Sequence, residues 1–264
     1  MAIIGSILGD IAGSVYEFSR PEDLDYKSIA LFTDNTFFTD DTVLLIATKY
    51  ALDNDRDFGS AYHTFGRDYR NCNWGTSFYN WIRKREIQPP YNSFGNGSAM
   101  RVSPVVDYVD NEKELLELAK ETAICTHNHP EGVKGACVTA MCTYMAKTGA
   151  SKNEILKYAM KFYNCGDYKY PVSMKLSQMR EDYKWDETCQ GSVPLAIRCF
   201  LEADSYEEYL RNVMSVKCDT DTIGAIGGGM AEEFFGETGF EDRKLLKYYL
   251  DDKLYEIVAG MIKE

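Results

Sequence analysis

Two acidic segments carry the side chains with the clearest chemical potential. One reads Phe38-Thr39-Asp40-Asp41-Thr42 and the other Asp219-Thr220-Asp221-Thr222-Ile223-Gly224, and each stands where a helix is expected to begin. Carboxylates and hydroxyls are hard oxygen ligands, the kind that Mg²⁺ and Mn²⁺ prefer. If the fold brings the two segments together, their side chains can hold one or two such cations.

Helix capping is the competing interpretation of both acidic segments. Asp and Thr are favoured N-cap residues, and a carboxylate interacts well with the positive end of a helix dipole. Four carboxylates gathered in one place would, however, repel one another and protonate or unfold the site. A bound cation relieves that repulsion, so capping and metal binding both remain open from spacing alone.

A glycine-rich segment runs Ser93-Phe94-Gly95-Asn96-Gly97-Ser98-Ala99-Met100-Arg101. Gly and Asn tolerate unusual backbone angles, and exposed backbone N–H groups in such a loop can cradle phosphate oxygens. The alternative is a plain glycine-rich turn that leads into the next element.

Two further positions can contribute to catalysis or binding. His127 is one of only three histidines, and no Cys or third His is suitably placed for a zinc site, so we expect it to contact a ligand or to be structural. Glu17 stands where the first helix gives way to a long loop, residues 18–37. Its carboxylate can act as a general base there, or it can be a solvated surface residue.

The apolar pattern predicts an all-α fold of many short helices, in a single domain that spans residues 1–264. The only strand candidate is residues 29–32. Long connections are expected over residues 18–37, 86–98 and 164–192, and loops of this length are often functional. The predicted helices cover residues 2–16, 41–52, 58–71, 75–85, 112–125, 131–147, 152–163, 193–203, 205–215, 222–235 and 250–262.

Rows of glycine occur in the first and the late helical segments. Gly5, Gly9 and Gly13 are spaced four apart, as are Gly224 and Gly228, so each row lies along one helix face. A face without side chains lets another backbone approach closely. We therefore expect the two rows to face each other and to draw the two acidic segments together.

The amino-acid composition indicates which kinds of partner and which cellular compartment to expect. The formal net charge is −12 and the estimated pI is about 4.8, which argues against nucleic acid or an anionic membrane as a partner. The eight cysteines form no Cys-x-x-Cys pair, so buried reduced thiols are expected. The N-terminus lacks a basic leader and no segment is long enough to span a bilayer, so we expect a cytoplasmic monomer.

In their order, these motifs resemble the ADP-ribosylglycohydrolase family, which includes the dinitrogenase reductase-activating glycohydrolase and the ADP-ribosyl-acceptor hydrolases. The resemblance runs nearly end to end. It is carried by Gly9-Asp10 with Gly13 and Glu17, by residues 38–42, by residues 95–101, by Thr126-His127, and by residues 219–225.

The resemblance implies a compact fold of orthogonal helices around a central cleft that holds two Mg²⁺ or Mn²⁺ ions. It implies a substrate-binding loop at Ser93, Phe94, Gly95, Asn96, Gly97 and Ser98, a ligand contact at His127, and Glu17 or Asp41 as the acid or base. The metal ligands that it implies are Thr39, Asp40, Asp41, Asp219, Asp221 and Thr222.

The activity implied by the resemblance is hydrolysis of the bond between ADP-ribose and an arginine or serine side chain, or a small ADP-ribose conjugate. Two other functions stay open. One is a non-catalytic ADP-ribose-binding relative, which typically would have lost some of the acidic ligands. The other is a metal-dependent nucleotide phosphohydrolase, which would release phosphate or AMP instead of ADP-ribose.

Overall fold

The computed structural model describes residues 1–164 and 166–262, and in that part the regular structure is helical, with no β-strand. Gly95 and Thr188 form an isolated β-bridge. The α-helices are α1 Ala2–Gly13, α2 Asp40–Asp53, α3 Phe58–Asp68, α4 Thr76–Ile82, α5 Gly97–Met100, α6 Glu112–Ile124, α7 Pro130–Lys147, α8 Lys152–Ala159, α9 Leu176–Asp182, α10 Cys189–Leu201, α11 Tyr206–Met214, α12 Thr220–Phe235, α13 Asp242–Tyr249 and α14 Asp252–Val258. Short 3₁₀ helices cover η1 Ser103–Asp107 and η2 Ala259–Met261.

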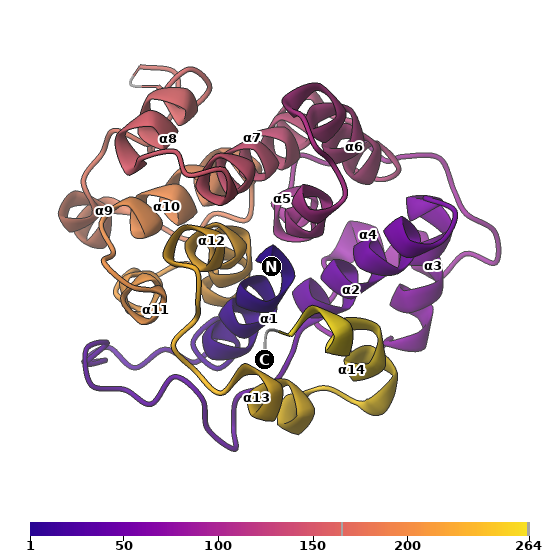
Figure 1. Cartoon of the computed structure of the whole chain (residues 1–264), viewed down its shortest axis with the longest axis horizontal. Helices are drawn as coiled ribbons and strands as arrows, with labels where there is room; N and C mark the ends of the chain where they lie inside the picture. Colours follow the sequence, from indigo (N-terminus) through magenta and orange to yellow (C-terminus); the bar gives the residue numbers. More distant parts are fainter. Residues whose placement is uncertain (165, 263–264) are drawn as a thin grey trace.

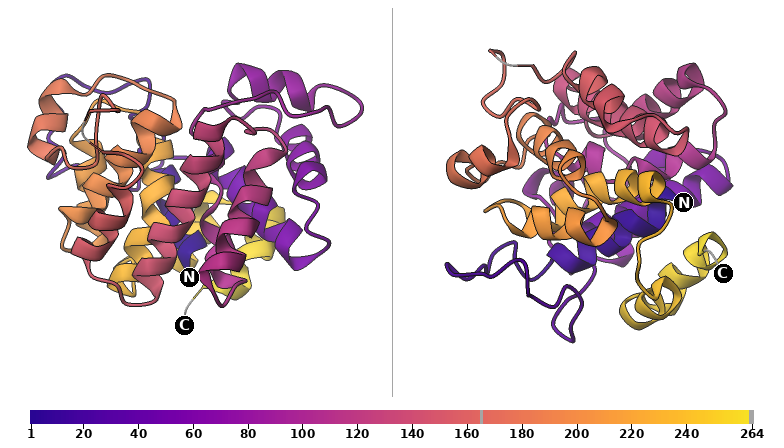
Figure 2. Two further views of the ribbon diagram at one scale, coloured as in Figure 1. Left: turned by 90° about the horizontal axis from the view of Figure 1, so that it is seen from above. Right: turned by 60° about the vertical axis from the view of Figure 1, so that its left-hand side comes forward.

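Helix α1 lies at the centre of the molecule, and the other helices surround it (Figure 1). Every residue of α1 is buried, which explains its nearly continuous apolar sequence. Helix α12 runs beside it in all views, although the two are about 200 residues apart in the chain (Figure 2). The start and the late part of the sequence therefore form the core that positions the two acidic segments.

The expected contact between the glycine rows is confirmed. A Cβ atom on Gly9 would overlap the backbone of Gly224, and one on Gly5 would overlap the carbonyl group of Gly228. At the end of α1 the hydroxyl of Thr220 donates to the carbonyl oxygen of Gly13 at 2.8 Å. Glycine costs helix propensity, and here close backbone packing offsets that cost.

The predicted helices are confirmed as elements, and several of their boundaries are wrong. Residues 250–262 hold α14 and η2 instead of one helix, and the extended backbone of Leu250 ends the preceding α13. Helix α10 begins at Cys189 and not at 193, since Thr188 caps it and Pro194 is accepted inside it. Residues 29–32 form bends and no strand.

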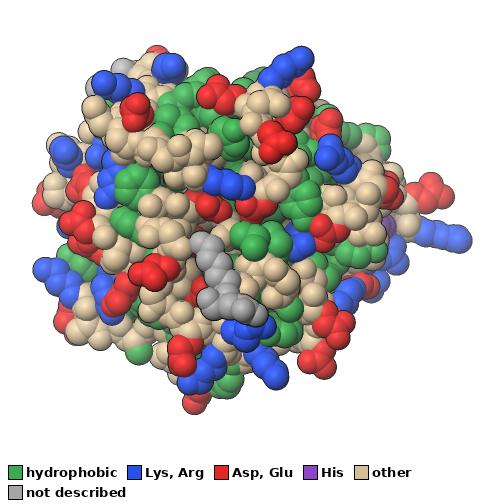
Figure 3. Space-filling model, in the orientation of Figure 1, with side chains coloured by type: hydrophobic (Ala, Val, Ile, Leu, Met, Phe, Trp, Pro, Cys, Tyr) green, Lys and Arg blue, Asp and Glu red, His purple; other side chains and the backbone are tan. Residues whose placement is uncertain are grey.

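Charged side chains of both signs are interspersed over the face shown in Figure 3. Among the described residues, seven cysteines are free thiols, and Cys142, Cys189, Cys199 and Cys218 are buried. No helix within the described ranges combines the length and the apolar character needed to cross a membrane.

Candidate active site

Three helix ends bring the acidic side chains together. Asp10 lies near the end of α1, Asp41 in the first turn of α2, and Asp221 in the first turn of α12. One carboxylate oxygen from each of these three lies within 4.8 Å of the other two. A second group at the same spacing joins Asp221 to Glu17 and Asp219. The two predicted segments therefore meet, and Asp221 belongs to both groups.

Asp10 holds the start of α2 in place. Its carboxylate accepts hydrogen bonds from the backbone N–H groups of Thr39 and Thr42, both at 3.0 Å, and from the hydroxyl of Thr39 at 2.8 Å. Thr39 is also the N-cap of α2, with its side chain accepting from the N–H of Asp41. Capping and site assembly are thus performed by the same residues.

The arrangement around Asp41 fits a hard cation. Its Oδ2 accepts a hydrogen bond from the Thr222 hydroxyl at 3.2 Å, whereas its Oδ1 is buried and has no hydrogen-bond partner among the described residues. A buried, unpaired carboxylate oxygen is costly unless a ligand or ion meets it. The surrounding donors are carboxylate and hydroxyl oxygens, which suit Mg²⁺, Mn²⁺ or Ca²⁺. The acidic cluster can therefore bind metal.

Burial and mutual repulsion raise the pKa values of these carboxyl groups. Burial raises the pKa of Asp10 to about 6, although its hydrogen bonds from Thr39 and Thr42 oppose the shift. Burial, and then neighbouring carboxylates, hold the pKa values of Asp40, Asp41 and Asp221 well above the ordinary range. Without a compensating cation the charged forms of these groups are disfavoured.

Glu17 lies at the edge of this cluster, four residues past the end of α1. Burial, followed by the charge of Asp219, raises its pKa to about 8. One of its oxygens belongs to the second acidic group, with Asp219 and Asp221. Glu17 is therefore a functional-site candidate and not the solvated surface residue of the alternative interpretation.

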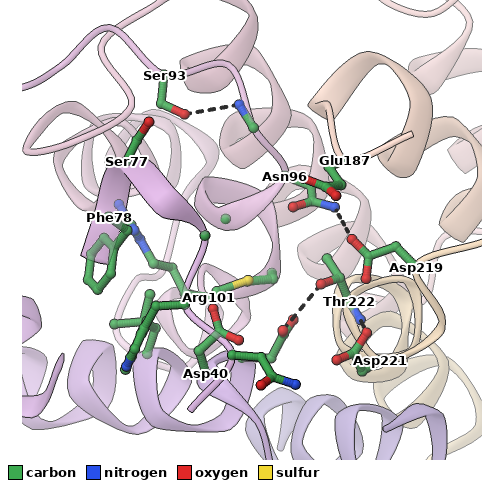
Figure 4. Close-up of a pocket in the computed structure, with 18 of the residues that line it drawn as sticks. Asp40, Ser77, Phe78, Ser93, Asn96, Arg101, Glu187, Asp219, Asp221 and Thr222 are labelled. Carbon is green, nitrogen blue, oxygen red and sulfur yellow. Dashed lines mark hydrogen bonds between the residues drawn. The ribbon is translucent and has the colours of Figure 1, made fainter. Parts of the chain in front are cut away.

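A cavity of about 490 Å³ opens above the acidic cluster. Its walls come from α2, the segment around α4, the glycine-rich loop and the start of α12 (Figure 4). Glu17, Asp40, Asp41, Asp219, Asp221 and Thr222 line it together with Ser93, Gly95, Asn96, Gly97 and His127. Thr39 does not line this cavity, because its hydroxyl is turned toward Asp10.

The glycine-rich loop is tied directly to the acidic cluster. The side-chain amide of Asn96 donates to Asp219 Oδ2 at 2.8 Å (Figure 4), and the N–H of Gly95 donates to the Ser93 hydroxyl at 3.1 Å. Two predicted loop residues lie elsewhere. The Phe94 ring is 45% exposed and packs against His129, and the buried Ser98 hydroxyl donates to the carbonyl of Gly132 at 2.7 Å.

His127 is buried beneath the loop. A Cβ atom on Gly97 would lie 3.2 Å from its Nε2 and one on Gly95 would lie 3.7 Å away, so that edge of the ring faces the loop. Its Nδ1 lies 2.8 Å from the hydroxyl of Thr126. Burial, and then the charge of Arg101, hold its pKa well below the ordinary value, so the ring is neutral.

Sequence reasoning assigned no role to three residues of the site. Asp10 is fully buried in an otherwise apolar helix, and a carboxylate in such a place needs compensation, which was a readable signal. Glu187 lines the cavity from the long segment before α10, and Arg101 lines it from the end of α5. Arg101 ends the glycine-rich motif, although no role was given to it there, whereas nothing in the local sequence marks Glu187, which long-range packing brings to the cavity.

Comparison with known proteins gives consistent matches along the chain. The model of the ADP-ribosylglycohydrolase family matches residues 1–262. ADP-ribosylhydrolase ARH3 from Mus musculus is 24% identical over 89% of this chain and 82% of its own length. The ADP-ribosylarginine hydrolase Tri1 from Pseudomonas putida (strain GB-1) is 22% identical over 90% of this chain and 70% of its own length.

The fold also matches a solved structure. A chain of the "ADP-ribosylglycohydrolase-related protein complex" superimposes with a TM-score of 0.69 at 22% sequence identity, covering 98% of this chain and 94% of that one. This likeness confirms the all-α architecture expected from the sequence.

Proposed function

The chain belongs to the ADP-ribosylglycohydrolase family, and we propose that it is a metal-dependent hydrolase that releases ADP-ribose from a modified side chain or a small conjugate. The observation that carries this proposal is that two clusters of three carboxylates each lie at the cavity and share Asp221. A protein that only bound ADP-ribose would have no need of so many buried, mutually repelling carboxylates.

The two groups support two cation positions. The first would use Asp10, Asp41 and Asp221, and the second Asp219 and Asp221, with Glu17 at its edge. Asp40 and Thr222 line the same cavity, and Thr39 acts by orienting Asp10 and Asp41. Hard divalent cations bound there would supply Lewis-acid stabilisation of substrate oxygens and a more acidic water.

Side chains and loop backbone of the cavity would bind the ADP-ribose and transfer the proton. The loop at Gly95–Gly97 and His127 would contact the ADP-ribose, and the carboxylates would hold the ribose over the cavity floor. Glu17, partly buried at the rim, would exchange a proton with water or with the leaving group. Asp41 is less suited to this role, because its Oδ2 is engaged by Thr222 and its carboxylate belongs to the buried group with Asp10 and Asp221.

The acceptor side of the cavity favours a cationic group. Phe18 lines the cavity, and its ring stacks on that of Trp185 with centroids 5.6 Å apart; both rings are exposed. The Nε1–H of Trp185 donates to Glu187 at 3.1 Å, and Glu187 faces the cavity beside Glu17. A guanidinium group can stack on an aromatic face while a carboxylate neutralises it. This supports an arginine conjugate over a serine conjugate.

A panel of conjugates tests this proposal. Peptides carrying ADP-ribosyl-arginine or ADP-ribosyl-serine are incubated with the protein and Mg²⁺, and the products are separated by anion-exchange chromatography. We expect intact ADP-ribose, with the arginine peptide cleaved faster. Release of AMP or phosphate would favour the phosphohydrolase alternative, and no product from any conjugate would favour the non-catalytic relative.

A further inference from the structure

Arg101 is a buried cation whose role the proposed reaction leaves unexplained. Its side chain is fully buried, and no ion pair joins it to a carboxylate in residues 1–164 and 166–262. The guanidinium lies 4.1 Å from the ring centroid of Tyr62. Its Nη2 donates to the carbonyl oxygen of Thr122 and to the Thr126 hydroxyl, both at 2.8 Å.

The contact with Arg101 sets the direction of the Thr126 hydroxyl. A guanidinium group has donors and no acceptor, so the oxygen of Thr126 must accept from Nη2. The hydroxyl hydrogen then needs an acceptor of its own. Within the described residues its hydrogen-bonding neighbours are Nδ1 of His127, at 2.8 Å, and the side chains of Tyr91 and Cys125. If Nδ1 instead carried a proton, the hydroxyl hydrogen would have to turn to Tyr91 or Cys125, because its 2.8 Å contact with the imidazole could no longer accept it. A phenol oxygen and a thiol sulfur are poorer acceptors than an imidazole nitrogen, so the unprotonated Nδ1 is favoured.

The opposite edge of His127 is free to act on a ligand. Its Nε2 faces Gly95 and Gly97, which line the cavity, and the ring is neutral because it is buried beside Arg101. In a neutral imidazole one nitrogen donates and the other accepts, and the partner of one nitrogen fixes the state of the other. With Nδ1 accepting from Thr126, the proton resides on Nε2.

We propose that Arg101 and Thr126 are positioning residues that fix His127 as the Nε2–H tautomer, so that it donates a hydrogen bond to an oxygen of bound ADP-ribose. The identity of the ligand rests on the proposed function, whereas the tautomer does not. Thr126 is not among the described residues that line the cavity, whereas Arg101 borders it and is linked to the histidine through Thr126. Each acts through the histidine.

The tautomer can be read directly by NMR on the full-length protein. Long-range ¹H–¹⁵N correlation spectra report which imidazole nitrogen carries the proton, and the chain has only three histidines to assign. We expect a protonated Nε2 and an unprotonated Nδ1 for His127, with or without Mg²⁺. A protonated Nδ1 in the wild-type spectrum would overturn the proposal, and this reading needs neither a variant nor catalytic turnover.

Substitutions at Thr126 test the link to binding. Thr126→Val removes the hydroxyl at nearly constant volume, so we expect a mixed tautomer and about tenfold weaker binding of free ADP-ribose with Mg²⁺, the size of one lost hydrogen bond. Thr126→Ser keeps the hydroxyl and should bind within about twofold of wild type. Thr139→Val is the matched control, because Thr139 is also fully buried but its hydroxyl has no hydrogen-bond partner among the described residues.

The combined outcomes decide the proposal. A folded Thr126→Val variant that keeps both the Nε2–H tautomer and the wild-type affinity would contradict it. If the valine variant does not fold, the wild-type spectrum and the serine variant still decide. Failure of the proposed hydrolysis would leave both readouts intact, so the two proposals fail separately.

Discussion

Two carboxylates, those of Asp221 and Glu17, determine how this cavity can bind a cation and transfer a proton. Asp221 contributes to both acidic groups, whereas Glu17 belongs to one of them and stands at the rim. Its pKa of about 8, raised by burial and then by Asp219, describes the protein without cations. A cation nearby would favour its ionised form. At the scale of residues, the open question is whether Glu17 transfers protons or holds a cation.

Replacing Glu17 with Gln separates these two roles. If Glu17 transfers protons, the E17Q variant should lose about 10²- to 10⁴-fold in kcat, while its affinity for Mg²⁺ and for free ADP-ribose stays near wild type. Steady-state kinetics and isothermal titration calorimetry measure both. The exposed Glu22, in the loop that follows, provides the control variant E22Q. Wild-type kcat in E17Q would assign the base to another group, such as Asp41.

At the scale of elements, the site depends on how closely α1 and α12 approach. The paired glycine rows bring the ends of these helices together, and Asp10 then fixes the start of α2 through Thr39 and Thr42. The carboxylates of the two acidic groups are therefore positioned by the packing of two helices that lie about 200 residues apart in the sequence.

A methyl group placed between the two helices should disturb both stability and metal binding. A Cβ atom on Gly228 would overlap the carbonyl of Gly5, so G228A should lower the free energy of unfolding by about 1–3 kcal/mol. Because the shift propagates along α12 to Asp221, Mg²⁺ affinity should fall as well. Denaturant titration and calorimetry check this, with G260A as control, since a Cβ atom there meets no atom within 4 Å. Unchanged Mg²⁺ affinity in a folded, destabilised G228A would refute the coupling.

Much of this element-level description could be predicted from the sequence. The helices with a strong apolar pattern and the meeting of the two acidic segments are confirmed. The short helices α5, α9 and α13 were missed, because helices of four to eight residues are stabilised by tertiary contacts and not by their own propensity. Glu187 was missed for a related reason, since the backbone hydrogen bond from Asn96 to its carbonyl places it at the cavity.

At the scale of the whole molecule, the acidic cluster should make stability depend on pH and on cations. In the folded protein the pKa values of Asp10 and Glu17 are about 6 and about 8, against ordinary values of about 4. The folded state therefore holds protons that the unfolded state releases. The stability that these two carboxyl groups contribute is fully present below about pH 4. It is lost as the pH rises through their folded-state pKa values, about 6 for Asp10 and about 8 for Glu17.

Thermal unfolding in EDTA should show this dependence. We expect a lower Tm at pH 8 than at pH 5 in EDTA, and a rise at pH 8 when Mg²⁺ replaces EDTA, because cations compensate the ionised carboxylates. Asp221→Asn removes a charge from both groups, so its Tm should depend less on pH and respond less to Mg²⁺. A wild-type Tm at pH 8 that ignores Mg²⁺ would speak against a cation at this cluster.

Metal-dependent hydrolysis is measured by the release of ADP-ribose from an ADP-ribosyl-arginine peptide, followed with Mg²⁺ and with EDTA. We expect intact ADP-ribose as the product with Mg²⁺, little or none in EDTA, recovery when Mg²⁺ is restored, and about a 100-fold or greater loss of rate in Asp221→Asn. The exposed Asp23, changed to Asn, should leave release unchanged. Release that continues at full rate in EDTA, or in the Asp221→Asn variant, would contradict metal-dependent hydrolysis at this acidic cluster.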